Sequence, residues 1–257
     1  GIPMGFSEEA EAEARAAAEP RLAGRTDLRD IPLITIDPAD ARDHDDAVYA
    51  EPDDDPKNPG GHVVWVAIAD VAAYVRPDSA LDREARDKGN SVYFPDRVEP
   101  MLPHTLSSNM CSLREGENRA CLAVRMTFDK VGRKTGHRFV RGLMRSAAKL
   151  SYEQAQAAID GTPDDQTGPL LDRILRPLWT AYGIMRKGRD ARSPLAIESA
   201  ERRIVISPEG EVVSIQQRVS LQAHQLIEEM MIQANVAAAE TLEQKRSPLI
   251  YRVHDTP

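Results

Sequence analysis

The chain has 257 residues, of which 41% are hydrophobic, so it is long enough to bury a substantial core in one large domain or two small ones. It has no stretch near eighteen consecutive apolar residues and no signal-peptide pattern at its N-terminus, which argues against membrane and secreted proteins and predicts a cytoplasmic one. The formal charge of -8 argues weakly against a polyanionic partner, because Lys and Arg carry most of the affinity for phosphates.

One segment departs from this acidic balance. Between Arg114 and Leu150 there are ten Lys or Arg residues against three acids, a local balance of +7. Such a segment is able to contact phosphates, although the solvated faces of strands and helices have the same composition. Both interpretations stay open from composition alone.

The first half of the chain is predicted to be rich in strands. Residues 7–19 form a helix with Ser7 as its N-cap and acids in the first turn. Apolar runs predict strands at 32–36, 47–50 and 62–69. A further strand pair is predicted at 120–128 and 136–142.

Helices are predicted to dominate the second half. Ser151 opens a helix with Gln154 at the capping-box position, and a second helix spans 170–187 with a bend at Pro177. Ser220 begins a long helix to about Gln244. Strands are predicted at 202–206, 211–215 and 249–253. This order predicts an α+β fold with a mixed or antiparallel sheet and flanking helices, and an end directly after an apolar strand predicts a domain that is incomplete at its C-terminus.

Five aspartates lie within ten positions of the segment IDPADARDHDDAV, residues 36–48. Four carboxylates held about 5 Å apart would repel by roughly 3 kcal/mol per pair at an effective dielectric near 20, so a converged cluster would need a divalent cation or a shifted protonation state. Convergence also requires an irregular loop, because consecutive residues of a strand point to opposite faces. Spacing alone leaves open a solvated acidic turn and a metal site. The five residues are Asp37, Asp40, Asp43, Asp45 and Asp46.

The residue types in this segment favour a hard ion if it binds a metal. The spacing does not match an EF-hand loop, which needs a glycine after alternating acids and a distant glutamate. Zinc is disfavoured because His44 stands alone among the carboxylates, while Cys111 and Cys121 lack CxxC spacing and are typical of reduced thiols. Ligation by oxygen alone points to Mg²⁺ or Mn²⁺, which are used in phosphoryl transfer.

An ordered series of short blocks resembles the catalytic (RNB) domain of the ribonuclease II / ribonuclease R family, and is closest in wording to its bacterial ribonuclease R branch. The resemblance begins near residue 28, which predicts a helical lead-in at 1–27 and the N-terminal part of the catalytic domain at 28–257. The blocks are IDPADARDHDDA (36–47), VAIADV (66–71), NSVYFP (90–95), PMLP (100–103), CSL (111–113), IEEMM (227–231) and YRVH (251–254).

The resemblance implies a magnesium-dependent, processive, 3′-to-5′ hydrolytic exoribonuclease that releases nucleoside 5′-monophosphates from single-stranded RNA, with Mn²⁺ as the alternative metal. The four family aspartates fall on Asp37, Asp43, Asp45 and Asp46, and Asp40 lies outside that set. All four are implied to be catalytic and to form the metal site, Asp45 by orienting the second metal or the attacking water. The alternative is a non-catalytic RNA-binding or regulatory member of the family, against which the intact set of four aspartates argues.

Three further residues match family positions that contact RNA. Tyr93 matches the aromatic that stacks on the 3′-terminal base, and Tyr152 and Glu229 match positions near the sugar at the RNA end. The residues alone favour a core or hairpin tyrosine at Tyr93, and packing at a helix start is the alternative for Tyr152. Glu228 is adjacent to Glu229 and about 100° away on a helix, so either is able to face the RNA. The basic segment 114–150 is a further candidate for the RNA channel.

The family also has parts that these 257 residues do not contain. The resemblance implies OB-fold RNA-binding domains on both sides of the catalytic domain, and a later SPIRRY-like block whose arginine contacts phosphate. We therefore expect the longer parent to be an exoribonuclease that acts as a monomer, and this chain alone to be weakly active or inactive.

Overall fold

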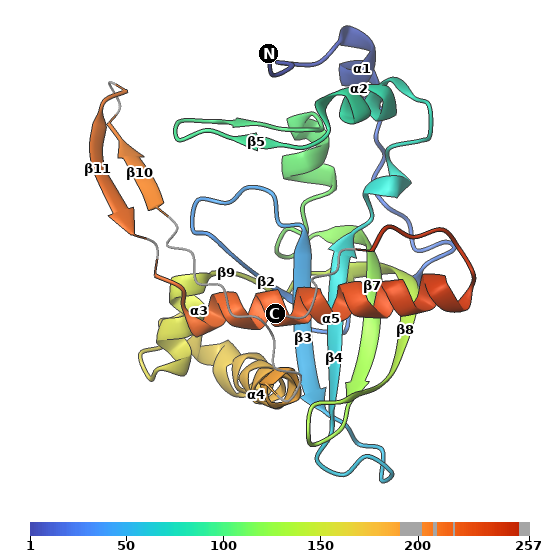
Figure 1. The fold of residues 1–257 in the computed structure, drawn as a ribbon, viewed down its shortest axis with the longest axis vertical. Helices are drawn as coiled ribbons and strands as arrows, with labels where there is room; N and C mark the ends of the chain where they lie inside the picture. Colours follow the sequence, from blue (N-terminus) through green and yellow to red (C-terminus); the bar gives the residue numbers. More distant parts are fainter. Residues whose placement is uncertain (191–201, 208–209, 218, 252–257) are drawn as a thin grey trace.

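The structure is a computed structural model that describes residues 1–190, 202–207, 210–217 and 219–251. At its centre lies a seven-stranded sheet with the strand order β1-β8-β7-β4-β3-β2-β9 (Figure 1). Antiparallel pairs form its middle, while β1 pairs with β8 and β2 pairs with β9 in parallel, so the predicted mixed sheet is confirmed. The strands are β1 (Thr26–Asp27), β2 (Ile34–Asp37), β3 (Asp46–Pro52), β4 (His62–Ala69), β7 (Asn118–Phe128), β8 (Lys134–Arg145) and β9 (Ala148–Ser151).

Three helices cover one face of the sheet. These are α3 (Tyr152–Ile159), α4 (Arg176–Asp190) and α5 (Gln222–Gln244), and α5 crosses β3, β4 and β7 in Figure 1. Alternate strand residues point to this face, so they form one core with the apolar side chains of the helices. Its fully buried members include Ile34, Val48, Val66, Leu226 and Met230.

The other face packs against the segments that lie above the sheet in Figure 1. They include α1 (Glu8–Arg15), α2 (Ala80–Lys88), and the turns Val71–Ala73 and Leu106–Met110. Close to them, β5 (Val92–Tyr93) and β6 (Val98–Glu99) form a small hairpin. Buried side chains of this second core include Leu33, Ala47, Trp65, Leu81 and Leu106. Each face of the sheet is thus covered by an apolar core. Polar groups are therefore expected mainly in the loops at the edge of the sheet.

Most predicted elements are found at or near their predicted positions. Ser7 caps α1 by accepting a hydrogen bond from the backbone of Ala10, and Ser151 and Gln154 form the predicted capping box of α3. The strands predicted at 202–206 and 211–215 are β10 (Arg202–Ile206) and β11 (Val212–Gln217), which pair antiparallel. Among the described helices, none is both long and apolar enough to cross a bilayer.

Two predicted elements differ from the structure. The helix predicted at 170–187 is a short turn at Gly168–Leu170, a π-helical turn at Leu171–Leu175 and then α4. Pro177 stands in the first turn of α4, where its missing N–H would have no helical partner, so the irregularity precedes the proline. The strand predicted at 249–253 is wrong for residues 249–251, which have no regular secondary structure, and its remainder lies outside the described residues.

Candidate active site

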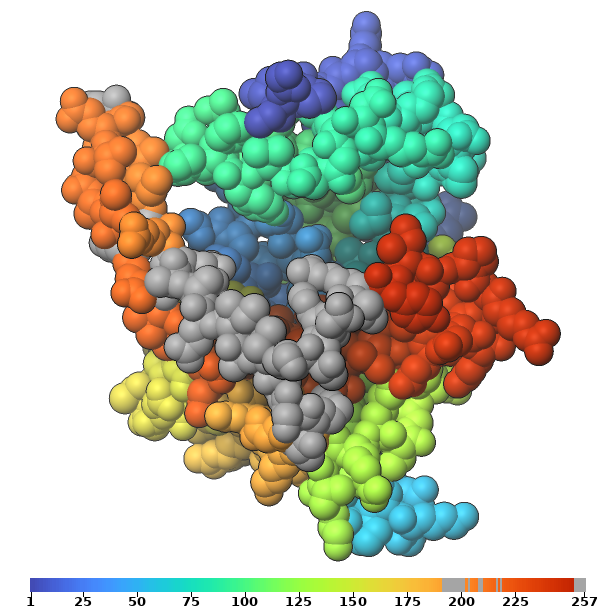
Figure 2. Space-filling view, viewed as in Figure 1, coloured from blue at the N-terminus to red at the C-terminus, as the bar shows by residue number. Residues whose placement is uncertain are grey.

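The aspartate loop, residues 37–46, connects two neighbouring strands. Asp37 ends β2 and Asp46 begins β3, and these strands pair antiparallel with Ile34 opposite Val48. Between them the backbone leaves the sheet and turns, with Ala41 N–H donating to Pro38 O at 2.9 Å. The loop is therefore irregular, which is the condition that convergence of neighbouring carboxylates requires. Figure 2 shows this blue part of the chain within a hollow below the green β5–β6 segment.

The four predicted aspartates have different surroundings. Asp37 is partly buried, and its Oδ2 lies 2.8 Å from Nδ1 of the buried His44 ring. Asp43 accepts a hydrogen bond from the Tyr93 hydroxyl at 3.2 Å. Asp45 is exposed and Asp46 half-buried at the start of β3. Asp40 is exposed farther along the loop, outside the predicted set.

The carboxylates perturb one another electrostatically. Burial, and then the charges of Asp37 and Asp45, raise the pKa of Asp46 to about 7. Partial desolvation, and then the charges of Asp43 and Asp37, raise the pKa of Asp45. Burial is the larger cause of both shifts and repulsion between the carboxylates adds to it, so a cation bound there would offset that repulsion.

The chemistry of this donor set fits a hard divalent cation, because all four predicted ligands are carboxylates. Their present arrangement is more open than a loaded site. Within the described residues, no group of three or more His, Cys, Asp or Glu side chains is arranged so that it could hold a metal ion as it stands. The aspartates would therefore have to draw together around a bound ion.

Tyr93 is brought to the aspartate loop by the β5–β6 hairpin. Its hydroxyl bonds to Asp43, while its side chain is 66% exposed. Desolvation, and then the charge of Asp43, raise its pKa, so the hydroxyl stays protonated and donates. The exposed ring excludes the alternative of a core tyrosine and leaves an aromatic face available beside the carboxylates.

Tyr152 is placed next to the aspartate loop by β9. Ser151 lies opposite Asp37 in the parallel β2–β9 pair, and Tyr152 follows it as the first residue of α3. The Tyr152 ring stacks on His224 of α5, with ring centroids 4.0 Å apart and planes at 15°. Tyr152 therefore lies at the edge of the site and packs on a neighbouring helix.

Glu229 and Glu228 differ clearly in burial. Glu229 is 1% exposed on α5, where its carboxylate accepts from Gln233 Nε2 at 2.9 Å and lies 3.4 Å from Arg189 of α4. Glu228 is exposed and also lies 3.4 Å from Arg189. Of the two, Glu229 is thus the residue that points into the helical layer.

Several side chains of the basic segment 114–150 already have partners within the chain. Arg133 pairs with Asp129 at 2.9 Å, and Arg141 with Asp70 at 3.2 Å. Arg119 is 2% exposed and lies within the fold. The segment is therefore not a uniform phosphate-binding stripe, and part of its positive charge stabilises the protein itself.

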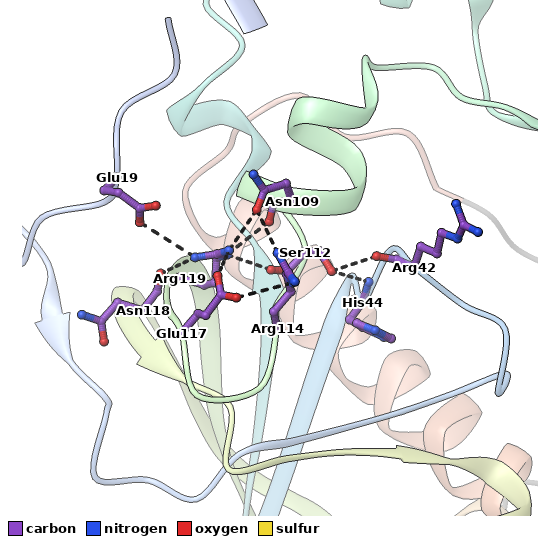
Figure 3. Close-up of polar contacts among 9 residues, drawn as sticks. All are labelled: Glu19, Arg42, His44, Asn109, Ser112, Arg114, Glu117, Asn118 and Arg119. Carbon is purple, nitrogen blue, oxygen red and sulfur yellow. Dashed lines mark hydrogen bonds and ion pairs between the residues drawn. The ribbon is translucent and has the colours of Figure 1, made fainter. Parts of the chain in front are cut away.

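Residues that support the aspartate loop were not predicted from the sequence. Ser112 contacts the loop backbone and Arg119 holds the chain around Ser112 (Figure 3). Ser112 belongs to the CSL block, which was the one signal that it matters. Its contact partner could not be read from the sequence, because His44 lies 68 positions away.

Comparison with known proteins identifies the family. The family model described as "RNB domain" matches residues 25–257 of the chain. The chain belongs to the RNB domain family. This confirms the resemblance found in the sequence blocks.

The RNB chain is similar over nearly all its length to proteins named ribonuclease R. It is 44% identical over 255 residues to the Escherichia coli protein, which covers 98% of this chain and 30% of that protein. It is 39% identical over 262 residues to the Thermotoga maritima protein, and this match covers 99% of this chain and 36% of that protein. The chain thus spans about a third of the length of these relatives.

Solved structures share the fold. Mycoplasma genitalium RNase R in complex with ribose methylated single-stranded RNA matches 100% of the RNB chain and 40% of its own chain, with a TM-score of 0.92 and 30% identity. Yeast Ssd1, described as a pseudonuclease, matches with a TM-score of 0.66 and 19% identity, which shows the fold alone. The fold by itself therefore does not separate a nuclease from a non-catalytic relative.

Proposed function

We propose that the RNB chain is the metal-binding part of a processive 3′-to-5′ exoribonuclease, which hydrolyses single-stranded RNA and releases nucleoside 5′-monophosphates. The observation that carries the proposal is the aspartate loop, where the charges of Asp37 and Asp45 act on Asp46 and the exposed Tyr93 bonds to Asp43. Similarity to proteins named ribonuclease R supports it. We place the parent protein in the cytoplasm, acting as a monomer with OB-fold domains that flank its catalytic domain.

In this proposal, each loop residue has a role at the scissile phosphate. Asp37, Asp43 and Asp46 would hold Mg²⁺, or Mn²⁺ in its place, and Asp45 would complete the site by orienting a second ion or the water. Bound ions of this kind stabilise charge on the attacking and leaving oxygens of a phosphodiester. Asp46 must lose its proton to act as a ligand, which the raised pKa permits near neutral pH.

RNA would enter along the exposed face of Tyr93. Its ring provides a stacking surface for the terminal base, and stacking of this kind is indifferent to sequence. Tyr152, which follows the residue paired with Asp37, would contact the sugar near the RNA end. Glu229 would take part only after its contact with Arg189 opens, since it is buried.

Release of mononucleotides from a 3′-tailed RNA, with and without Mg²⁺, tests the proposal. The E. coli ribonuclease R serves as the positive control. We expect weak or no release by the chain alone, because it lacks the arginine block that clamps the phosphate in the family. Rapid degradation by the chain would overturn that expectation, whereas failure of the chain to bind Mn²⁺ would overturn the proposed metal site and with it the nuclease proposal.

Asp45→Asn separates catalysis from binding. Because the chain alone is expected to release little, the variant is made in the longer parent protein, where we expect it to abolish metal-dependent release while RNA binding, measured by fluorescence anisotropy, stays close to wild type. Asp40→Asn is the matched control, because Asp40 is an exposed aspartate of the same loop outside the proposed set. Full activity of Asp45→Asn would contradict the role given to Asp45.

The alternative is a non-catalytic RNA-binding or regulatory protein. The fold permits it, since yeast Ssd1 is described as a pseudonuclease. The presence of all four aspartates argues for the nuclease. RNA binding with no effect of Mg²⁺, Mn²⁺ or Asp45→Asn would favour the alternative.

A further inference from the structure

The aspartate loop gathers negative charge, so it needs attachments that hold its backbone against repulsion. Each end is fixed by a strand, Asp37 in β2 and Asp46 in β3. Between the ends, the loop leaves the sheet and its backbone polar groups require other partners. The position of Asp43 and His44 therefore depends on residues outside the loop.

Ser112 supplies such an attachment. Its hydroxyl accepts from the backbone N–H of His44 at 3.0 Å and donates to the carbonyl of Arg42 at 3.2 Å. The next residue extends the contact, because Leu113 N–H donates to His44 O at 2.8 Å. Ser112 is fully buried and His44 is 4% exposed, so water has little access to replace these bonds.

Arg119 holds the segment that carries Ser112. Its Nε donates to the carbonyls of Ser112 at 2.9 Å and Asn109 at 3.2 Å, and its Nη1 donates to Asn118 O at 3.0 Å. The guanidinium is 2% exposed and its charge is met by Glu117, with Glu19 at 3.9 Å (Figure 3). Its planar array of donors thus fixes several points of the 109–119 segment at once.

The attachment reaches a proposed metal ligand through His44. The backbone of His44 is held by Ser112 and Leu113, and its ring Nδ1 lies 2.8 Å from Asp37 Oδ2. Hydrogen bonds that are buried at Ser112 and partly buried at Asp37 therefore lead from Arg119 to Asp37. It connects a strand in the middle of the sheet with the carboxylate that ends β2.

We propose that Ser112 and Arg119 are positioning residues, which anchor the backbone of the aspartate loop at Arg42 and His44 so that its carboxylates can draw together around a metal ion. The metal part of this inference rests on the proposed function. Residues that orient ligands from behind commonly change metal affinity 10–100-fold when they are replaced. Ser112 and Arg119 would act in that way without touching metal or RNA.

Ser112→Ala tests this role against a matched serine. Ser146 is also buried and its hydroxyl also bonds to a backbone carbonyl, that of Ala148, at the opposite end of β2 from Asp37. We expect Ser112→Ala to speed hydrogen exchange of the His44 amide at least tenfold by NMR and to weaken Mn²⁺ binding about tenfold by calorimetry. Ser146→Ala should change neither, although both variants lose a buried hydroxyl.

A second variant tests the same role even if Ser112→Ala does not fold. Arg119→Lys retains the charge but cannot reach several carbonyls with one planar group, so it should also speed exchange of the His44 amide. Unchanged exchange and unchanged Mn²⁺ affinity in Ser112→Ala, or equal changes in Ser146→Ala, would overturn the inference. If the wild-type chain bound no Mn²⁺, the proposed metal site would fail, while the exchange of the His44 amide would still decide whether Ser112 holds the loop.

Discussion

Tyr93 presents two different groups at the aspartate loop. Its ring is exposed, and its hydroxyl bonds to a carboxylate of the aspartate loop. In the proposed function the ring is the stacking surface, so Tyr93→Phe should keep RNA affinity close to wild type, while Tyr93→Ala should lose about 1–3 kcal/mol of binding free energy. Fluorescence anisotropy with a 3′-ended oligonucleotide measures both.

Val98→Ala controls for damage to the hairpin in this comparison. Val98 lies opposite Tyr93 in the β5–β6 pair and is also exposed, but it offers no aromatic face. Its truncation should leave RNA affinity unchanged. Equal losses in Val98→Ala and Tyr93→Ala would show that hairpin structure, rather than stacking, determines the binding.

At the scale of single residues, the sequence indicated the charged groups of the site but not the residues that hold them in place. The aspartate spacing and the repulsion between carboxylates raised the metal site as one of two interpretations, and the family resemblance selected the residues. The structure adds the irregular loop and the perturbed Asp46. Ser112 could not be assigned a role, because its bond to His44 exists only after segments 68 positions apart come together.

Among the elements, local patterns located the strands that lie in apolar runs, including the four-residue β2, and missed β9 and the two-residue strands. The apolar run 62–69 coincides with β4, which is buried in the middle of the sheet. β9 was missed because its sequence, AKLS, is not an apolar run and because it follows β8 after only two residues. Its parallel pairing with β2 joins residues more than 100 positions apart, yet this pairing sets Tyr152 beside Asp37.

Two glycines of α4 offer a test of how closely this helix packs. A Cβ at Gly188 would stand 2.4 Å from the carbonyl oxygen of Gly132, in the turn between β7 and β8. A Cβ at Gly183 would have no atom within 4 Å apart from its chain neighbours and the backbone of its own helix. Gly188→Ala should therefore lose about 1–3 kcal/mol of unfolding free energy, whereas Gly183→Ala should gain about 0.5–1 kcal/mol from its higher helix propensity. Urea denaturation measures both changes.

The opposite signs make this pair its own control. Both substitutions add one methyl group to the same helix, so a general effect of alanine would move both variants in one direction. A stable Gly188→Ala variant would show that α4 is able to shift away from the turn. That result would contradict close packing between α4 and the β7–β8 turn.

Across the whole molecule, the sheet gathers distant segments around one acidic loop. The loop lies between β2 and β3, Tyr93 comes from a hairpin, and Ser112 and Arg119 come from the segment that enters β7. The two apolar cores fix these elements from both faces of the sheet. The free energy of folding therefore has to outweigh the repulsion between the loop carboxylates. Protonation of one of these carboxylates should then change the free energy of unfolding of the chain.

The stability of the metal-free chain should fall as pH rises. The pKa of Asp46 is raised from 3.8 to about 7, so the folded chain binds this proton more tightly than the unfolded chain. Its contribution is complete below about pH 4 and is lost as pH rises through 7. At about 1.4 kcal/mol per pH unit, unfolding free energy measured in urea should drop by at most about 3 kcal/mol between pH 5 and 8. Asp46→Asn should remove this drop, whereas Asp40→Asn should retain it. Mg²⁺ should stabilise the chain more at pH 8 than at pH 5, because it competes with the proton for Asp46. An unchanged pH profile in Asp46→Asn would contradict the link between Asp46 protonation and stability.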